Sequence, residues 1–269
     1  MDDVLYEARM LAESGVKELI VVAQDTSRYG TDLPGHKRLL APLLRELCKI
    51  EKLHWIRVHY VYPDEFDDEL IDTIAQEEKI VKYLDIPIQH CNDTILKKMN
   101  RRGSGAFVAD LLAKLRARIP GLVIRTSIIT GLPGEGEEEF EELCNFLREQ
   151  QLPRVGAFAF SPEEGTEAAK MEYPDHEVAV RRAELLEMIQ SDIMDAYNAS
   201  MIGKTMEVLV EAYDEENEQY YGRTYGDSPD IDGRVWLACD EPLTEGTFVM
   251  VCIDGCIDGD LAGYVVEEE

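Results

Sequence analysis

Two apolar patterns alternate from the N-terminus to Phe160. Short continuous apolar runs predict buried strands over 19–23, 55–61, 122–130 and 154–160, with a further strand beginning at Tyr83. Longer stretches with apolar residues three and four apart predict helices over 2–14, 39–50, 66–76, 95–99, 107–119 and 137–150. Because strands and helices alternate, we predict an α/β fold with parallel strands, as a barrel or a doubly wound sheet. For a barrel the opening helix is anomalous, since a first strand should precede it.

The pattern changes after Pro174. A long amphipathic helix is expected over 176–200, because that stretch contains neither glycine nor proline. Short strands are then expected over 205–213, 220–225, 234–238, 247–253 and 261–266, separated by Asp-Gly and Glu-Gly turns. This spacing predicts a small OB-like β-barrel. We therefore divide the chain into an α/β core (1–174), a linker helix (175–203) and a C-terminal all-β domain (204–269).

Polar side chains follow three of the predicted parallel strands. They are Gln24-Asp25-Thr26, Gln89-His90 and the stretch from Thr130 to Glu135, and a parallel barrel would bring them to one mouth. Gly131 would let the backbone approach a ligand closely. A phosphate loop is disfavoured, because no Gly-Lys-Ser/Thr follows and four glutamates crowd the next helix start. A zwitterionic or neutral ligand fits better, and simple structural turns remain the alternative.

The charge of the chain is strongly negative. Lysine and arginine total 27 against 55 acidic residues, a net charge of −28. The predicted barrel carries 18 acidic and 3 basic residues, and therefore lacks the cations with which OB-like barrels bind nucleic acid. This composition favours a basic protein partner over RNA, with a merely solvated acidic surface as the alternative.

One dense basic cluster stands out in this acidic chain. It consists of Lys97, Lys98, Arg101 and Arg102, at the end of a predicted helix. Such residues complement a helix C-terminus. The functional interpretation is a carboxylate-binding edge close to the mouth of the predicted barrel.

The six cysteines are scattered and include no Cys-x-x-Cys pair. Cys252 and Cys256 form the only close pair and have no further ligand at metal spacing, so we expect no metal site. Reduced thiols suit a reducing compartment. With no apolar run near the roughly 20 residues of a membrane span and no signal peptide, we expect a cytoplasmic protein without membrane contact.

Five sequence motifs together resemble the radical S-adenosylmethionine (SAM) methylthiotransferases. The Gln24-Asp25-Thr26 motif and the stretch ending in Gln89-His90 resemble the RimO branch, which methylthiolates an aspartate on a small-subunit ribosomal protein, the twelfth. The tRNA-modifying branch usually has a Ser-Gly-Ser-like continuation at His90-Cys91-Asn92. The C-terminal barrel resembles the TRAM domain of the family. The stretches that carry the resemblance are 23–30, 83–90, 99–103, 125–135 and 160–166.

The resemblance also implies residues that this chain lacks. The family carries an N-terminal domain with three cluster-binding cysteines, and then Cys-x-x-x-Cys-x-x-Cys on the first barrel strand, which binds the 4Fe-4S cluster that cleaves SAM. Neither pattern is present. We therefore expect an N-terminally truncated fragment, with a partial radical SAM barrel lacking its first strand, that is inactive alone. The family abstracts hydrogen with a 5′-deoxyadenosyl radical, because an unactivated methylene cannot be deprotonated by a side chain.

By resemblance, specific residues would contact the cofactor and substrate. Gln24 and Asp25 would lie near the SAM amino group, Gln89 near its ribose and Arg125 near its carboxylate. The adenine would face Thr130 and Gly131, with Phe158 on the following strand. His90, Arg101 and Arg102 would contact the substrate protein.

Three functions follow from these observations. The leading one is aspartate methylthiolation of a basic small-subunit ribosomal protein. The alternatives are a tRNA-adenosine methylthiotransferase, which the acidic barrel disfavours, and a non-catalytic acidic module that binds basic proteins.

Overall fold

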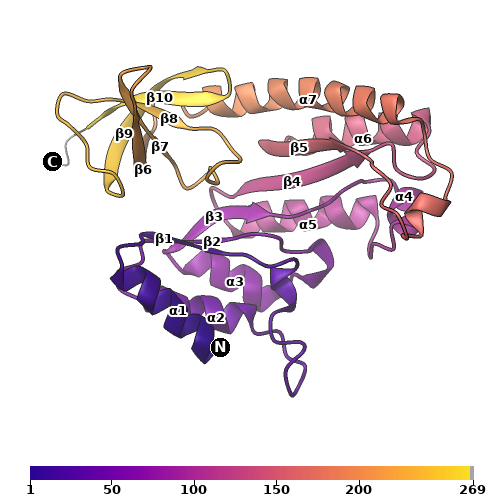
Figure 1. The fold of residues 1–269 in the computed structure, drawn as a ribbon, viewed down its shortest axis with the longest axis horizontal. Helices are drawn as coiled ribbons and strands as arrows, with labels where there is room; N and C mark the ends of the chain where they lie inside the picture. The colour runs from indigo at the N-terminus through magenta and orange to yellow at the C-terminus, as the bar shows by residue number, and fades with distance from the viewer. Residues whose placement is uncertain (267–269) are drawn as a thin grey trace.

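A five-stranded parallel sheet and a closed five-stranded barrel make up the computed structural model, which describes residues 1–266 (Figure 1). The sheet has the order β1-β2-β3-β4-β5, and every neighbouring pair is parallel. This arrangement confirms the predicted fold class, with strand-helix alternation giving a parallel sheet. The strands are β1 (Glu18–Val21), β2 (Trp55–Val58), β3 (Ile80–Asp85), β4 (Val123–Thr130) and β5 (Arg154–Ala159).

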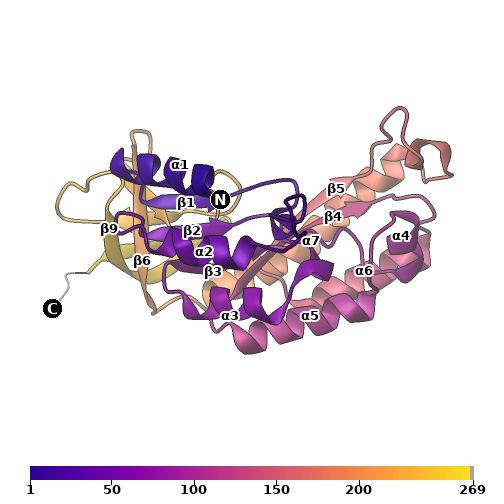
Figure 2. The same cartoon turned by 90° about the horizontal axis from the view of Figure 1, so that it is seen from below.

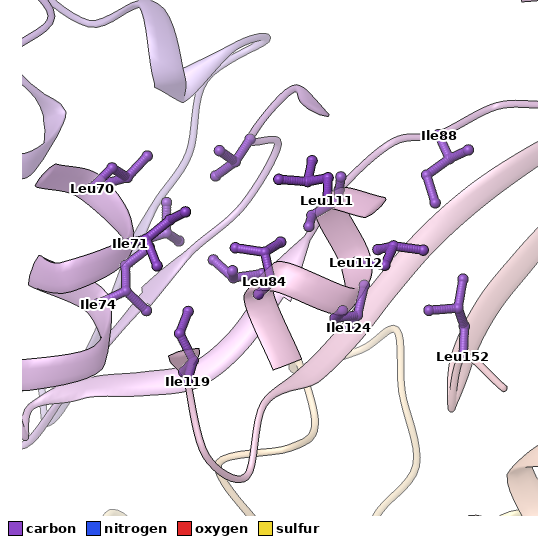
Figure 3. Close-up of a cluster of buried hydrophobic side chains, with 14 of the residues drawn as sticks. Leu70, Ile71, Ile74, Leu84, Ile88, Leu111, Leu112, Ile119, Ile124 and Leu152 are labelled. Carbon is purple, nitrogen blue, oxygen red and sulfur yellow. The ribbon is translucent and has the colours of Figure 1, made fainter. Parts of the chain in front are cut away.

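The outer face of the sheet is covered by helices, as the view from below shows (Figure 2). Alternate strand residues, such as Leu84 on β3 and Ile124 on β4, pack there against leucines and isoleucines of the helices (Figure 3). Burying these side chains gives the core its main stabilisation, at roughly 25 cal/mol per Å² of apolar surface. The helices are α1 (Asp2–Glu13), α2 (Leu40–Cys48), α3 (Asp68–Gln76), α4 (Asp93–Lys98), α5 (Gly105–Arg118) and α6 (Glu137–Gln150).

The helices begin at the capping residues that the sequence supplies. Asn92 accepts hydrogen bonds from the backbone N–H groups of Thr94 and Ile95, as expected for the start of α4. Asp67 caps α3 and Ser104 caps α5 in the same way. These caps explain why α4 and α5 each begin two residues earlier than the apolar pattern alone indicates.

Strand β3 differs from the prediction at both ends. It begins at Ile80, three residues before Tyr83, because the half-buried Lys82 interrupts the apolar run without interrupting the strand. It ends two residues before Pro87, which cannot donate to the ladder. The chain then continues beside β4, where Gln89 forms an isolated parallel bridge with Ile128.

The other face of the sheet is concave and carries the alternate residues. Tyr83 and Asp85 of β3 lie on this side, followed by Gln89 beyond the end of the strand, and Arg125 lies opposite Asp85 on β4. Near the beginnings of the strands, Trp55 and other apolar residues of this face pack against the barrel. The concave face therefore has one end at the barrel and the other at the carboxyl ends of the strands.

A long helix, α7 (His176–Ala199), leads from the sheet to the barrel across one side of the molecule (Figure 1). The barrel closes in the order β10-β8-β7-β6-β9, as predicted for an OB-like domain. Glu267, Glu268 and Glu269, assigned to this domain from the sequence, lie outside the described residues. The barrel strands are β6 (Thr205–Asp214), β7 (Gln219–Arg223), β8 (Val235–Ala238), β9 (Phe248–Ile257) and β10 (Asp260–Val265).

Candidate functional site

The carboxyl ends of the parallel strands carry most of the expected cofactor residues. After β1, Gln24 is exposed, and Asp25 begins the short 3-10 helix η1 (Thr26–Arg28) by accepting a hydrogen bond from the backbone N–H of Ser27. Asp25 is also paired with Arg28 at 3.2 Å. A cavity of about 420 Å³ opens beside this turn and is lined partly by apolar residues of β1 and α2.

Gln89 occupies a strained position beside β4. Its φ is 71°, its backbone N–H donates to the carbonyl of Ser127 at 2.9 Å, and its carbonyl accepts from Ile129 at 2.9 Å. This conformation costs energy in a residue other than glycine, and two backbone hydrogen bonds hold it. Within residues 1–266 its half-buried side chain makes no hydrogen bond, so the amide is free to bind a ligand.

The side chain of His90 points into the protein, away from the side on which the amide of Gln89 is free. Its side chain is fully buried, with Nδ1 accepting a hydrogen bond from the backbone N–H of Asn92. A neutral imidazole must then carry its proton on Nε2, which lies 3.4 Å from Oε2 of Glu135. The other oxygen, Oε1, accepts from Gly131 and from Arg182 on α7. Buried His90 thus lies between the segment after β3, the glycine turn and α7, and its expected contact with the substrate stays a prediction.

Thr130 and Gly131 lie where the sequence places them, at the end of β4, but both face α7. The hydroxyl of Thr130 donates to the carbonyl of Ala179 at 2.8 Å. Gly131 has a φ of 74°, and a Cβ there would lie 2.3 Å from Cβ of Ala179. The alternation of strand side chains puts Thr130 on the helix side of the sheet. Its side chain therefore faces α7 and not the concave side, and the expected adenine contact of this stretch stays a prediction.

Phe158 lies on the concave side of β5 and is 53% exposed. The aromatic ring is available for stacking against a flat ligand. The neighbouring Gly156 leaves room beside it, since a Cβ at that position would contact the ring at 3.0 Å. Among the expected adenine contacts, Phe158 is the one whose side chain faces the open side of the sheet.

Arg125 is held by two carboxylates at the barrel end of the concave face. Its Nη1 lies 3.3 Å from Asp85, and its Nε lies 3.8 Å from Asp232 of the barrel. Burial raises the pKa of Asp85, with the neighbouring Asp232 acting in the same direction, and Arg125 opposes both. Arg125 precedes Thr130 by five residues, roughly 16 Å along a strand. The structure thus separates it from the other expected cofactor residues.

The expected substrate-binding arginines lie beside the segment that follows β2. The guanidinium of Arg101 stacks 4.6 Å from the ring centre of Tyr62. Arg102 lies 3.9 Å from Asp64, and its side chain is 75% exposed. An exposed pair of this kind is weak, so Arg102 can exchange Asp64 for another carboxylate.

The six cysteines are free, and burial raises the pKa of Cys91 to about 12. No group of three or more His, Cys, Asp or Glu side chains within residues 1–266 is placed to hold a metal ion. The thiols of this chain therefore do not fit an iron-sulfur cluster, which needs several cysteines together. No helix in the same residues combines the length and apolar character required to cross a bilayer.

Comparisons with known proteins identify the class to which this sheet belongs. The family model described as "Radical SAM superfamily" matches residues 1–147, and the chain therefore belongs to that superfamily. A second model, the TRAM domain, matches residues 202–266 and so covers the closed barrel. Coproporphyrinogen III oxidase from Escherichia coli, a radical SAM enzyme, has the same fold, with a TM-score of 0.53 and 16% identity over 71% of this chain and 45% of that chain.

Within the superfamily, the chain is similar to proteins named ribosomal protein uS12 methylthiotransferase RimO. It is 48% identical to the one from Caldanaerobacter subterraneus subsp. tengcongensis, over 98% of this chain and 60% of the relative. It is 46% identical to the one from Acetivibrio thermocellus, over 100% of this chain and 59% of the relative. The resemblance inferred from the motifs is confirmed, and the chain spans about 60% of the length of these relatives.

The sequence interpretation missed the buried polar groups that support the site. The acidic stretch predicts only that phosphate is disfavoured, whereas the carboxylate of Glu135 accepts hydrogen bonds from the backbone N–H of Gly131 and from Arg182. The two-residue period running back from Gln89 could have placed Asp85 and Tyr83 on the concave face. Their partner Asp232 carried no such signal, because it lies 147 residues beyond Asp85 in a separate domain.

Proposed function

We propose that this chain is the radical SAM core and TRAM domain of a methylthiotransferase that modifies an aspartate of ribosomal protein uS12. The observation that carries the proposal is 44–48% identity to eight proteins of that name over nearly the whole chain. The free polar and aromatic side chains at the carboxyl ends of the strands support it, because ligands of parallel α/β folds bind at that edge.

SAM would bind across those strand ends in this proposal. Gln89 offers an amide for hydrogen bonding to hydroxyl groups, and exposed Gln24 offers another at the end of β1. Phe158 offers an aromatic face for the adenine. The backbone N–H of Gly131 donates a hydrogen bond to Glu135, so Gly131 would contribute to the site by shaping the turn. Asp25 would accept a hydrogen bond from the cofactor's ammonium group, in competition with Arg28.

The radical chemistry of such an enzyme requires a 4Fe-4S cluster that reduces SAM. The cysteines of this chain do not fit that cluster, because no group of three or more His, Cys, Asp or Glu side chains within residues 1–266 is placed to hold a metal ion. We propose that the 269 residues alone do not cleave SAM. Incubating the purified chain with iron, sulfide, a reductant and SAM should yield no 5′-deoxyadenosine. Its iron-dependent formation would contradict this proposal.

Substrate recognition is proposed to use two charged surfaces. The acidic TRAM domain would attract a basic ribosomal protein, because its cations are few and largely engaged. Arg223 is buried in ion pairs, and Arg234 stacks on Tyr221 at 4.4 Å. Exposed Arg102, with Arg101 beside it, would receive the carboxylate of the target aspartate.

The decisive experiment uses a protein that contains this chain together with cluster-binding segments. With reconstituted clusters, SAM and a reductant, it should add a methylthio group to one aspartate of uS12, detected by mass spectrometry of peptides. The same protein should leave tRNA unmodified. Modification of an adenosine in tRNA, with uS12 unchanged, would favour the alternative tRNA enzyme. Binding of uS12 without modification would favour an acidic binding module.

A further inference from the structure

The loop between β7 and β8 of the barrel is seated on the concave face of the core. Asp227 in this loop pairs with Arg154 at 2.7 Å. Asp232 accepts a hydrogen bond from the hydroxyl of Tyr83 at 2.6 Å and lies 3.8 Å from Arg125. The carboxylates of both aspartates are at most 5% exposed. Two barrel anions thus pair with two core cations away from water.

Two more polar contacts extend the same interface across β2. Arg57, whose side chain is completely buried, donates to the carbonyl of Tyr225 in the loop at 2.8 Å. Nε2 of His59 lies 3.1 Å from the hydroxyl oxygen of Ser228. The loop therefore provides polar partners for strands β2, β3, β4 and β5, rather than for a single neighbour.

An apolar cluster completes the contact beside these ion pairs. Trp55 and Tyr83 of the core share it with Leu209 of β6, and Phe248 of β9 packs edge-on against Trp55 with ring centres 4.8 Å apart. This burial contributes favourable free energy that does not depend on charge. Ion pairs alone would give orientation with little net stabilisation.

From these contacts we propose that the β7–β8 loop, residues 224–234, locks the TRAM barrel onto the radical SAM core as one rigid body. In this arrangement Arg125 and Asp232 serve the lock, and Arg125 is not available as a cofactor ligand. Separating the domains would break the pairs of Asp227 with Arg154 and of Asp232 with Arg125, and would expose the apolar cluster to water. The lock thereby fixes the position of the acidic barrel surface relative to the strand ends, where the reaction would take place.

Hydrogen–deuterium exchange of the 269-residue chain tests this lock. In the unaltered chain, residues 224–234 should exchange about as slowly as strands of the core, because their opening requires domain separation. Asp232→Asn should raise exchange in this loop and at the start of β4 by about tenfold, the loss expected for a hydrogen bond to a charged group. The middle of β9, inside the barrel, should keep its protection.

Asp230→Asn is the matched control. It removes one negative charge from the same loop, and Asp230 is exposed and makes no side-chain hydrogen bond in the described residues. Its exchange pattern should equal that of the unaltered chain. Fast exchange of residues 224–234 in the unaltered chain, or equal effects of the two substitutions, would overturn the lock.

A second variant keeps the test decisive if Asp232→Asn does not fold. Tyr83→Phe removes the hydroxyl that donates to Asp232 and changes no charge. It should raise exchange in residues 224–234 in the same pattern, by a smaller factor. Unchanged exchange in the folded Tyr83→Phe chain would contradict the proposal, since losing a buried contact of the lock should make opening of the loop easier.

Discussion

Nε2 of His90 lies 3.4 Å from Oε2 of Glu135, and both side chains are completely buried. Arg182 holds the other oxygen of the same carboxylate at 2.8 Å. Glu135 thus binds the turn after β4 to helix α7 and lies beside the segment that follows β3. A buried carboxylate is tolerated only with such partners, so this group should be important for stability although the proposed chemistry does not use it.

Glu135→Gln should lower the free energy of unfolding by about 3 kcal/mol, because it leaves the buried guanidinium of Arg182 with less compensation. Urea denaturation followed by circular dichroism measures this loss. Glu138→Gln, on the exposed first turn of α6, is the control and should change stability little. Equal effects of the two substitutions would show that the buried carboxylate contributes no more to stability than an exposed one.

Gly131→Ala should destabilise the protein by several kcal/mol, on the order of 3, because strain at positive φ adds to an overlap. The added Cβ would lie 2.3 Å from Cβ of Ala179, and the φ is 74°. Gly165→Ala is a useful comparison, since its φ is 84° but nothing lies within 4 Å. If both variants lower the thermal unfolding midpoint equally, the whole effect of Gly131→Ala comes from backbone strain.

Acidification should weaken the domain contact through His59. Burial, with the charges of Arg57 and Arg125 acting in the same direction, lowers the pKa of His59 to about 4. At pH values between the ordinary pKa of about 6.5 and the lowered pKa of about 4, His59 is protonated in the unfolded chain and neutral in the folded chain. Stability therefore decreases as the pH falls through this range.

Replacement of His59 by Gln should flatten the pH dependence in that interval, as measured by urea unfolding at a series of pH values. His176→Gln, at the exposed start of α7, is the control and should leave the dependence as it is. Glu18 adds a further loss of stability at lower pH, where its carboxylate becomes protonated. Burial opposes its ionisation, but the charges of Arg57 and Arg223 outweigh that effect and lower its pKa. An unaltered slope between pH 6.5 and 4 in His59→Gln would refute the assignment to this histidine.

Alkylation should distinguish the cysteines by burial. Cys256 is exposed and should react first with iodoacetamide near neutral pH. Burial and the charge of Glu142 raise the pKa of Cys91 to about 12, so its thiolate is scarce and its access is closed. Peptide mass spectrometry should find Cys91 unlabelled in the folded chain and labelled in denaturant. Labelling of Cys91 as fast as Cys256 would contradict the buried position.

Gln89 and Arg125 should respond differently in a SAM-binding form of the protein that includes the cluster. Gln89→Ala should weaken SAM binding by about tenfold, the loss expected for one hydrogen bond of about 1.4 kcal/mol. Arg125→Gln should leave the dissociation constant of SAM within a factor of a few and should loosen residues 224–234 instead. Calorimetric titration with SAM measures the first effect. The reverse outcome would return Arg125 to the cofactor site.

The order of elements was predictable because each reports its own environment. Apolar runs and helical spacing placed the ten strands and seven α-helices found within residues 1–266, although α4, capped by Asn92, starts two residues before the apolar pattern indicates. The direction of individual side chains was less accessible. His90 follows β3 and Thr130 ends β4, but both side chains turn inward. The partner of His90 is Glu135, on the turn before α6, and the partner of Thr130 is Ala179 on α7, and such partners leave no local pattern. The contact between Arg125 and Asp232 was inaccessible for the same reason, because Asp232 belongs to another domain.

Because the β7–β8 loop places its aspartates on core arginines, the barrel and the core are matched parts and cannot be exchanged as independent modules. A TRAM domain grafted from another protein without Asp227 and Asp232 would leave Arg154 and Arg125 facing neutral or repulsive groups. Chimeras should therefore fail at the junction unless these charges are transferred together. Exchange of partner specificity between such enzymes would require the two sides of the contact to change as a set.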